Sequence, residues 1–288
     1  MQTLTQIKAL LEERGLRPNK SLGQNFLCDH NLLRRLVEAS GAEPGDLVLE
    51  VGPGTGTLTE SLLERGCKVI ACEVDRGLAA LLADRLDRFG ERVDLISGDC
   101  LAGKRSINHA VLERLQGRPF RLVANLPYGV ASPLMALLAT DHHPRIASER
   151  PACMGQFVTV QQEVADRLSA GPGSKEFGEL GVVVQAMCEV SNVATLGPEC
   201  FWPRPKVSSR MVAIVPRERP MIEEPSVLVN ACRMLLGQRR KQIGGILARE
   251  APWVLSRLPK GVEPTMRAEA LRVEQFVEMA RAIARSES

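Results

Sequence analysis

The stretch Asp46-Leu-Val-Leu-Glu-Val-Gly-Pro-Gly-Thr-Gly56 decides the fold. An almost continuous apolar run followed at once by glycines is typical of a buried parallel strand that ends in a tight turn. Residues 57–65 then have helical spacing and are followed by Gly66, a residue type that commonly ends a helix. A strand, a glycine turn and a helix in this order predict the first unit of a doubly wound sheet.

The same alternation continues down the chain. Further strands are expected at 68–74, 93–97, 121–124, 154–160, 192–196 and 207–215. Helices are expected between them at 77–89, 107–116, 133–139, 161–169 and 178–188. Repeated strand–helix–strand units predict an α/β protein with a Rossmann-like, doubly wound sheet and helices on both faces.

The two flanks of the sheet have a different pattern. Prolines interrupt a charged stretch after the last strand and indicate a domain boundary there: Pro216, Pro220 and Pro225. Helical spacing beyond them predicts a small all-helical domain, with helices at 226–236, 239–249 and 267–285. At the other end, helices are expected at 4–14 and 31–39, the second capped by Asp29. We therefore divide the chain into an N-terminal helical segment (1–45), a sheet domain (46–215) and a C-terminal helical domain (216–288).

Composition excludes several classes of protein. The 288 residues are 44% hydrophobic and 25% charged, which excludes a disordered chain. No run approaches 18 apolar residues and the N-terminus has no secretory pattern, so we expect a cytoplasmic protein without a membrane span. Eight scattered cysteines, with no Cys-x-x-Cys pair, indicate buried thiols and no metal site. His142 and His143 precede Pro144 and are expected in a solvated turn.

Three features at one edge of the predicted sheet indicate a nucleotide-like ligand. Glycines at 52 and 54 allow the backbone to approach a ligand without a Cβ clash. The second strand ends in Glu73, 21 residues after Gly52, where a carboxylate accepts both ribose hydroxyls. The third strand is followed by Asp99, an acid suited to the adenine amino group. Each feature alone has a plain structural explanation, a tight turn or a helix cap, whereas the three together favour a binding site.

The flanking acids decide which ligand is expected. The dinucleotide pattern requires a further glycine at position 57, where this chain has Thr57. A pyrophosphate favours a helix N-terminus free of carboxylates, but Glu50 precedes this loop. A cationic, phosphate-free nucleoside fits better, and we expect S-adenosylmethionine as the cofactor.

Asn125-Leu126-Pro127-Tyr128 follows the fourth strand and contains the only tyrosine of the chain. The exocyclic amine of adenine is a poor nucleophile, because its lone pair is delocalised into the ring. If the Asn125 side-chain oxygen and the Leu126 carbonyl accept hydrogen bonds from this amine, its lone pair becomes available for reaction. Pro127 would stiffen the loop that carries these acceptors. Tyr128 is expected to stack on the flipped base. An isolated tetrapeptide of this kind could simply pack, but its place beside the glycine loop favours catalysis.

A second loop carries aromatic and basic residues between prolines. Phe201 is expected to cover the other face of the base, and Trp202 beside it to line the same site. Lys206 and Arg204 are expected near phosphate.

Taken together, these motifs resemble the bacterial small-subunit ribosomal RNA adenine dimethyltransferases, the KsgA/RsmA group. The matching stretches are Leu22–Leu27, Glu50–Gly54, Glu73–Asp75, Gly98–Asp99, Asn125–Tyr128, Gln161–Ala165, Pro172–Lys175, Phe201–Val207 and Gln238–Lys241. The resemblance implies a seven-stranded class I methyltransferase sheet over 46–215 and a C-terminal domain that contacts the 30S ribosomal subunit. It also implies transfer of four methyl groups, two to each of two adjacent adenosines in a 16S rRNA hairpin.

The resemblance assigns cofactor contacts by position. They are Asn25, Leu27, Gly52, Glu73, Asp99 and Asn125, to which the glycine-loop reasoning adds Gly54. The segment from Lys20 to Leu27 is expected to fold over the cofactor as a lid that includes Phe26. One departure lies after Tyr128, where the family usually has Asn or His and this chain has Gly129, which is expected to loosen the loop.

Basic charge is concentrated in the C-terminal quarter. From Pro216 onward there are 13 Lys and Arg against 9 Asp and Glu, whereas the first 215 residues hold 24 against 25. Arg239, Arg240 and Lys241 are expected on one helical turn that contacts RNA phosphate, although a solvated helix face explains them equally well.

Two alternatives to small-subunit methylation stay open. One is methylation of an adenosine in large-subunit RNA, the activity of the macrolide-resistance enzymes. The other is a ribosome-assembly or RNA-binding factor that keeps the fold without activity, although Glu73, Asp99, Asn125 and Tyr128 are all present. We expect a monomer with no obligate protein partner.

Overall fold

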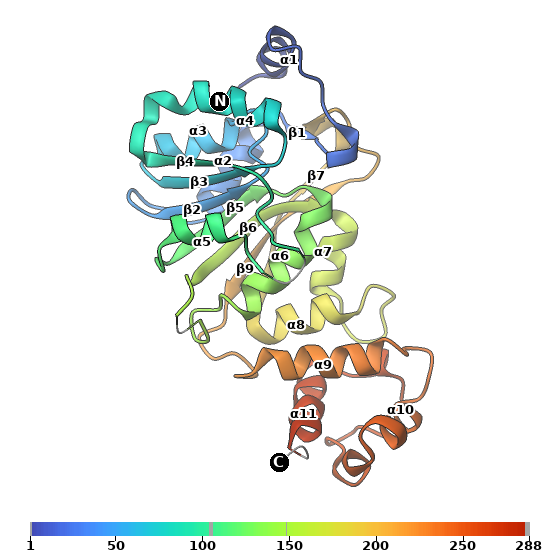
Figure 1. The fold of residues 1–288 in the computed structure, drawn as a ribbon. Helices are drawn as coiled ribbons and strands as arrows, with labels where there is room; N and C mark the ends of the chain where they lie inside the picture. Colours follow the sequence, from blue (N-terminus) through green and yellow to red (C-terminus); the bar gives the residue numbers. More distant parts are fainter. Residues whose placement is uncertain (1, 104–105, 148, 286–288) are drawn as a thin grey trace.

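A seven-stranded sheet forms the centre of the molecule in the computed structural model, which describes residues 2–103, 106–147 and 149–285 (Figure 1). The strand order is β4-β3-β2-β5-β6-β9-β7. Its strands are β2 (Leu47–Val51), β3 (Lys68–Glu73), β4 (Val93–Ser97), β5 (Phe120–Asn125), β6 (Cys153–Gln161), β7 (Cys188–Leu196) and β9 (Ser209–Pro216). The first five in this order are parallel, and β9 runs antiparallel to both β6 and β7. The chain order reverses between β2 and β5, the position at which doubly wound sheets bind ligands.

Helices cover both faces of the sheet, as the alternation of elements predicted. One face packs against α2 (His30–Ala39), α3 (Thr57–Glu64) and α4 (Arg76–Leu86). The other packs against α5 (His109–Leu115), α6 (Tyr128–Thr140), α7 (Gln162–Ser169) and α8 (Glu179–Met187). Val48 belongs to the first hydrophobic cluster and Leu49 to the second, because successive strand residues point to opposite faces. Residues on both faces of β2 are therefore buried, which explains its almost continuous apolar run.

The N-terminal segment folds beside the edge of the sheet. It contains α1 (Leu4–Glu13), a 3-10 turn at Lys20–Leu22 and the short strand β1 (Phe26–Leu27). Strand β1 pairs antiparallel with β8 (Phe201–Trp202), which follows a 3-10 turn at Pro198–Cys200, so that Phe26 lies opposite Trp202. Two segments that are distant in the sequence therefore form one small sheet.

The C-terminal segment is helical, as expected, and packs beneath α8 (Figure 1). It contains α9 (Pro225–Leu236), α10 (Ile243–Glu250), α11 (Val273–Ala284) and 3-10 turns at Pro252–Arg257 and Ala268–Ala270. Its apolar residues continue the cluster on the α8 side of the sheet, where the rings of Phe177 and Phe276 lie 6.1 Å apart. The domain boundaries at 45/46 and 215/216 stay predictions.

Several local expectations were wrong. The helix expected at 133–139 begins at Tyr128 and contains Pro133 in its interior, although proline is favoured at the first helical position. The helix expected at 239–249 begins only at Ile243. His142 and His143, which were expected in a solvated turn, are buried. Their rings form hydrogen bonds with the Pro151 carbonyl at 2.7 Å and the Met187 carbonyl at 3.0 Å, respectively.

The eight cysteines are free thiols, and six of them are buried. None of the described helices has the length and apolar character that crossing a membrane requires.

Candidate active site

A cavity of about 700 Å³ opens at the carboxyl ends of β2 to β5. The residues expected to bind the cofactor or the target base all line it: Asn25, Leu27, Gly52, Gly54, Glu73, Asp99, Asn125, Leu126, Pro127, Tyr128 and Phe201. The expected RNA-contacting residues Lys206, Arg239, Arg240 and Lys241 do not line it. The fold thus brings six separate sequence motifs to one place.

The glycine loop after β2 is in close contact with both the lid and the tetrapeptide after β5. Gly52 and Gly54 have φ angles of 72° and 62°, in the left-handed region that favours glycine. A Cβ at Gly52 would lie 2.7 Å from Pro127, and one at Gly54 would lie 2.9 Å from the Phe26 ring. Larger residues would therefore displace the walls of the cavity.

Glu73 at the end of β3 is 3% exposed and is held in place by backbone groups. Its Oε2 accepts from the Gly54 amide at 3.1 Å, and its Oε1 accepts from the Asp75 amide at 3.0 Å. Burial raises the pKa of Glu73, and these backbone bonds oppose the rise. Asp99 is exposed, and its Oδ1 accepts from the Leu101 amide at 2.9 Å.

Sequence reasoning did not assign Glu50 to the site, although it noted the residue as a flanking acid. Glu50 lines the cavity and is 2% exposed, and among the described residues its Oε2 has no hydrogen-bond partner. Burial raises its pKa to about 8, and the nearby Glu73 carboxylate adds to this rise. An unpartnered buried carboxyl group favours a cationic ligand next to it. The sequence signal was an acid within the apolar run of β2.

Asn125 at the end of β5 is fixed by the lid. Its Nδ2 donates to the Asn25 carbonyl at 3.0 Å, which leaves Oδ1 as the acceptor of the side chain. The Leu126 amide donates to the Thr159 carbonyl at 3.1 Å, so the next residue is also tied to the sheet. Asn125 and Leu126 thus enter the cavity on a rigid strand end.

Tyr128 is the first residue of α6 rather than part of a loop. It is half-buried, and burial raises its pKa. Gly129 lies in the same helical turn, and a Cβ there would meet nothing within 4 Å. The expectation that Gly129 loosens a loop is therefore wrong, because there is no loop at this position.

Three of the four aromatic residues expected at the site line the cavity, namely Phe26, Tyr128 and Phe201. Trp202 does not, because it is stacked on Phe26 with ring centroids 6.2 Å apart, and Lys8 lies 5.4 Å from its centroid. Neighbouring residues of β8 point to opposite faces, so Phe201 and Trp202 do not share one site.

The basic residues expected to contact RNA differ in their surroundings. Lys206, Arg240 and Lys241 are exposed. Arg239 forms an ion pair of 2.8 Å with Glu269 and also donates to the Lys175 carbonyl at 3.2 Å. The expectation of one helical turn for residues 239–241 is wrong, since they lie in the turn between α9 and α10.

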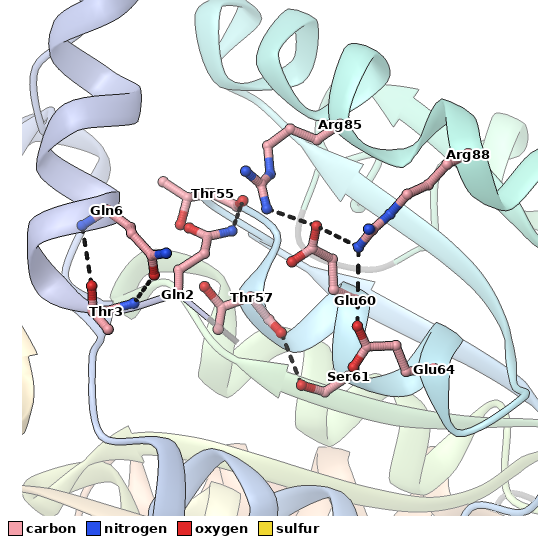
Figure 2. A network of polar contacts seen from close by, with 10 residues as sticks. All are labelled: Gln2, Thr3, Gln6, Thr55, Thr57, Glu60, Ser61, Glu64, Arg85 and Arg88. Atoms are coloured by element: carbon pink, nitrogen blue, oxygen red, sulfur yellow. Dashed lines mark hydrogen bonds and ion pairs between the residues drawn. The ribbon is translucent and has the colours of Figure 1, made fainter.

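Polar contacts that sequence reasoning missed hold the end of the glycine loop and the helix that follows it (Figure 2). Gln2 is 4% exposed, and its Nε2 donates to the Thr55 carbonyl at 2.8 Å. On the next helix, Glu60 pairs with Arg85 at 2.6 Å and with Arg88 at 3.3 Å, which joins α3 to α4. No motif marks these residues, because their partners are distant in the sequence.

The family profile described as "Ribosomal RNA adenine dimethylase" matches residues 15–285, almost the whole chain. This protein belongs to the ribosomal RNA adenine dimethylase family. Members of the family called "Ribosomal RNA small subunit methyltransferase A" are similar over more than nine-tenths of their length. The one from Lactobacillus acidophilus is 37% identical, covering 96% of this chain and 95% of its own. The one from Rhodococcus opacus is 38% identical, covering 96% and 92%.

Solved structures of this fold include a dimethyladenosine transferase from Plasmodium falciparum. It has a TM-score of 0.67 at 24% identity and covers 87% of this chain and 94% of its own. The 23S rRNA methyltransferase ErmE has a TM-score of 0.65 at 24% identity, covering 90% and 99%. At this identity the two structures establish the methyltransferase fold, as the sequence predicted.

Proposed function

We propose that this protein transfers methyl groups from S-adenosylmethionine to the exocyclic amines of two adjacent adenosines in a hairpin of 16S rRNA. The observation that carries the proposal is the placement of Asn125 in the lining of the cavity that also contains the buried carboxyl groups of Glu50 and Glu73. We further propose that the protein acts on the 30S subunit and that it is a cytoplasmic monomer.

The cavity fits this cofactor on three grounds. The unpartnered carboxyl of Glu50 suits a positively charged group. The glycines at 52 and 54 let the loop pack against Pro127 and the Phe26 ring in the cavity wall, and Glu73 and Asp99 supply acceptors for ribose hydroxyls and an adenine amine. Asn25, Leu27 and Asn125 complete the binding residues. Bound there, S-adenosylmethionine supplies an electrophilic methyl group.

The chain's own residues then activate the target amine. The Asn125 side-chain oxygen and the Leu126 carbonyl accept hydrogen bonds from the two N–H groups of this amine. The nitrogen lone pair is then directed away from the ring. Pro127 and the N-terminal turn of α6 keep these acceptors in place as charge develops on nitrogen. Tyr128 and Phe201 hold the base by stacking. No strong general base is needed, because the methylated ammonium loses its proton to water.

The small subunit is favoured over the large one by the relatives named for it, which are 37–38% identical over nearly the whole chain. Incubating the protein with each purified subunit and labelled cofactor tests this assignment. Label is expected in 30S subunits that lack the modification. Label in the large subunit alone would support the other enzyme class, and binding without label would support an inactive assembly factor.

Exposed cations are proposed to contact RNA phosphate. Lys206 lies in the loop that leads into β9, and Arg240 and Lys241 lie in the turn after α9. We propose that Arg239 also contacts RNA phosphate, although its guanidinium forms an ion pair with Glu269. Subunit affinity should fall with salt, and more steeply for the unaltered protein than for the Arg240→Glu variant.

A further inference from the structure

The lid is attached to the sheet at two points, one on each side of the glycine loop. At the end of β5, Asn125 donates to the Asn25 carbonyl at 3.0 Å. Beyond the end of β3, Gln24 Nε2 donates to Asp75 Oδ2 at 3.0 Å. Strands β3 and β5 flank β2 in the sheet, so these two bonds lie on either side of the strand that carries the glycine loop.

Both ends of the Gln24 amide are engaged. Its Oε1 accepts from the Asn19 amide at 2.7 Å, at the base of the lid, and its Nε2 faces Asp75. Asn19 itself caps the 3-10 turn of the lid by accepting from the Ser21 amide at 3.0 Å. The orientation of the Gln24 side chain is therefore set by the lid, and its donor group faces the sheet.

Asp75 connects this bond to the cofactor carboxylate. Its Oδ1 caps α4 by accepting from the amides of Gly77 and Leu78 at 2.9 Å and 3.1 Å, which leaves Oδ2 for Gln24. Its own amide donates to Glu73 Oε1 at 3.0 Å. A continuous chain of hydrogen bonds thus joins the lid to Glu73.

We propose that Gln24 is a positioning residue that fastens the lid to Asp75 and keeps the cofactor enclosed, without touching the reacting atoms. The inference rests on the proposed function in one respect, the identity of the enclosed ligand. The bond made by Asn125 lies at the reaction site, whereas the bond made by Gln24 lies beyond Glu73. Loss of the Gln24 bond is therefore expected to weaken cofactor retention and leave the chemical step intact.

Hydrogen exchange of the full chain without any ligand tests the attachment itself. Gln24→Ala removes the bonds to both Asn19 and Asp75, so the amides of residues 20–27 should exchange at least about five to ten times faster, the factor that a single hydrogen bond supplies. Gln242→Ala is the matched control, because that glutamine is exposed and makes no cap bond to its helix. Unchanged exchange in Gln24→Ala would overturn the proposal.

Exchanging donor and acceptor tests the pairing of the two side chains. Gln24→Glu places two carboxylates together, and Asp75→Asn places two amide NH₂ groups together. The double variant restores one donor and one acceptor in reverse, while the amide introduced by Asp75→Asn keeps an oxygen for the cap of α4. Lid exchange should therefore be fast in both single variants and near normal in the double variant. A double variant as fast as the singles would contradict direct pairing.

Kinetics then show what the attachment does. Gln24→Ala should raise the KM for S-adenosylmethionine about five- to tenfold and change kcat less than about twofold. Trp202 stacks on Phe26 of the lid, so its fluorescence in a Trp253→Phe background reports lid position directly. Normal methylation with unaltered KM would overturn the inference alone, whereas faster exchange in a protein that binds no S-adenosylmethionine would overturn the proposed function alone.

Discussion

The side-chain amide of Asn125 donates a hydrogen bond of 3.0 Å to the backbone carbonyl of Asn25, across 100 residues of sequence. This bond uses the NH₂ group of Asn125 and leaves the oxygen to accept from a target amine. It also joins the lid to the catalytic strand end. The Asn25 carbonyl of the lid therefore helps to set the direction in which the Asn125 oxygen points.

Asn125→Ala is expected to abolish methylation while retaining part of the cofactor affinity. The variant removes an acceptor that is needed when charge develops on the amine, a loss of about 10²–10³-fold in kcat. Single-turnover transfer and a separate measurement of cofactor binding distinguish the two effects. Near-normal turnover would refute the mechanism.

Cofactor affinity should rise as pH increases toward about 8, the raised pKa of Glu50 in the free protein. The pKa of Glu50 is raised to about 8 by burial, so this group is protonated at neutral pH in the free protein. A cationic ligand favours the carboxylate and lowers that pKa, and binding at pH 7 therefore releases a proton. Calorimetry in two buffers of different ionisation enthalpy measures the proton. Glu50→Gln should bind without this release, and an equal release in that variant would assign the proton elsewhere.

The contribution of His142 and His143 to stability should fall as pH drops below about 6.5, the ordinary pKa of histidine, whereas the raised pKa of Glu50 acts in the opposite direction. Burial lowers the pKa values of His142 and His143 in the folded protein. The unfolded chain therefore binds more protons in this window, and acid shifts the equilibrium toward it. Nearby charged groups also act on these pKa values: Arg150 lowers and Asp141 raises that of His142, and Arg145 lowers that of His143. Thermal melts at pH 5 to 8 measure the effect, which should be smaller in the double variant His142→Gln/His143→Gln.

Two glycines in the site should respond oppositely to alanine. Gly129→Ala adds a methyl group to open space in a helix and should raise the free energy of unfolding by about 0.5–1 kcal/mol. Gly54→Ala places a Cβ 2.9 Å from the Phe26 ring at a φ of 62°, and should weaken cofactor binding and lower stability. Denaturant titration and cofactor titration of both variants provide the comparison. A stability loss in Gly129→Ala would show that the open space is occupied.

Much of the site was predictable because its residues follow sequence signals that act locally. The apolar run of β2 and the glycines after it identified a parallel strand and its turn. Glu73, Asp99 and Asn125 were found because the ends of parallel strands meet at one edge of the sheet. Glu50 was noted but not assigned, since its burial and its missing partner depend on the tertiary fold.

Sequence alone determined the α/β alternation, the helical C-terminal segment and the family, since periodicity, turn residues and motifs are properties of neighbouring residues. Tertiary structure decided which distant elements meet. It paired β1 with β8 and so turned Trp202 onto Phe26 instead of into the cavity. It also buried the two histidines, paired Arg239 with Glu269 in an ion pair and placed Gln24 within hydrogen-bond distance of Asp75. These outcomes follow from contacts between residues far apart in the chain, which no local pattern encodes.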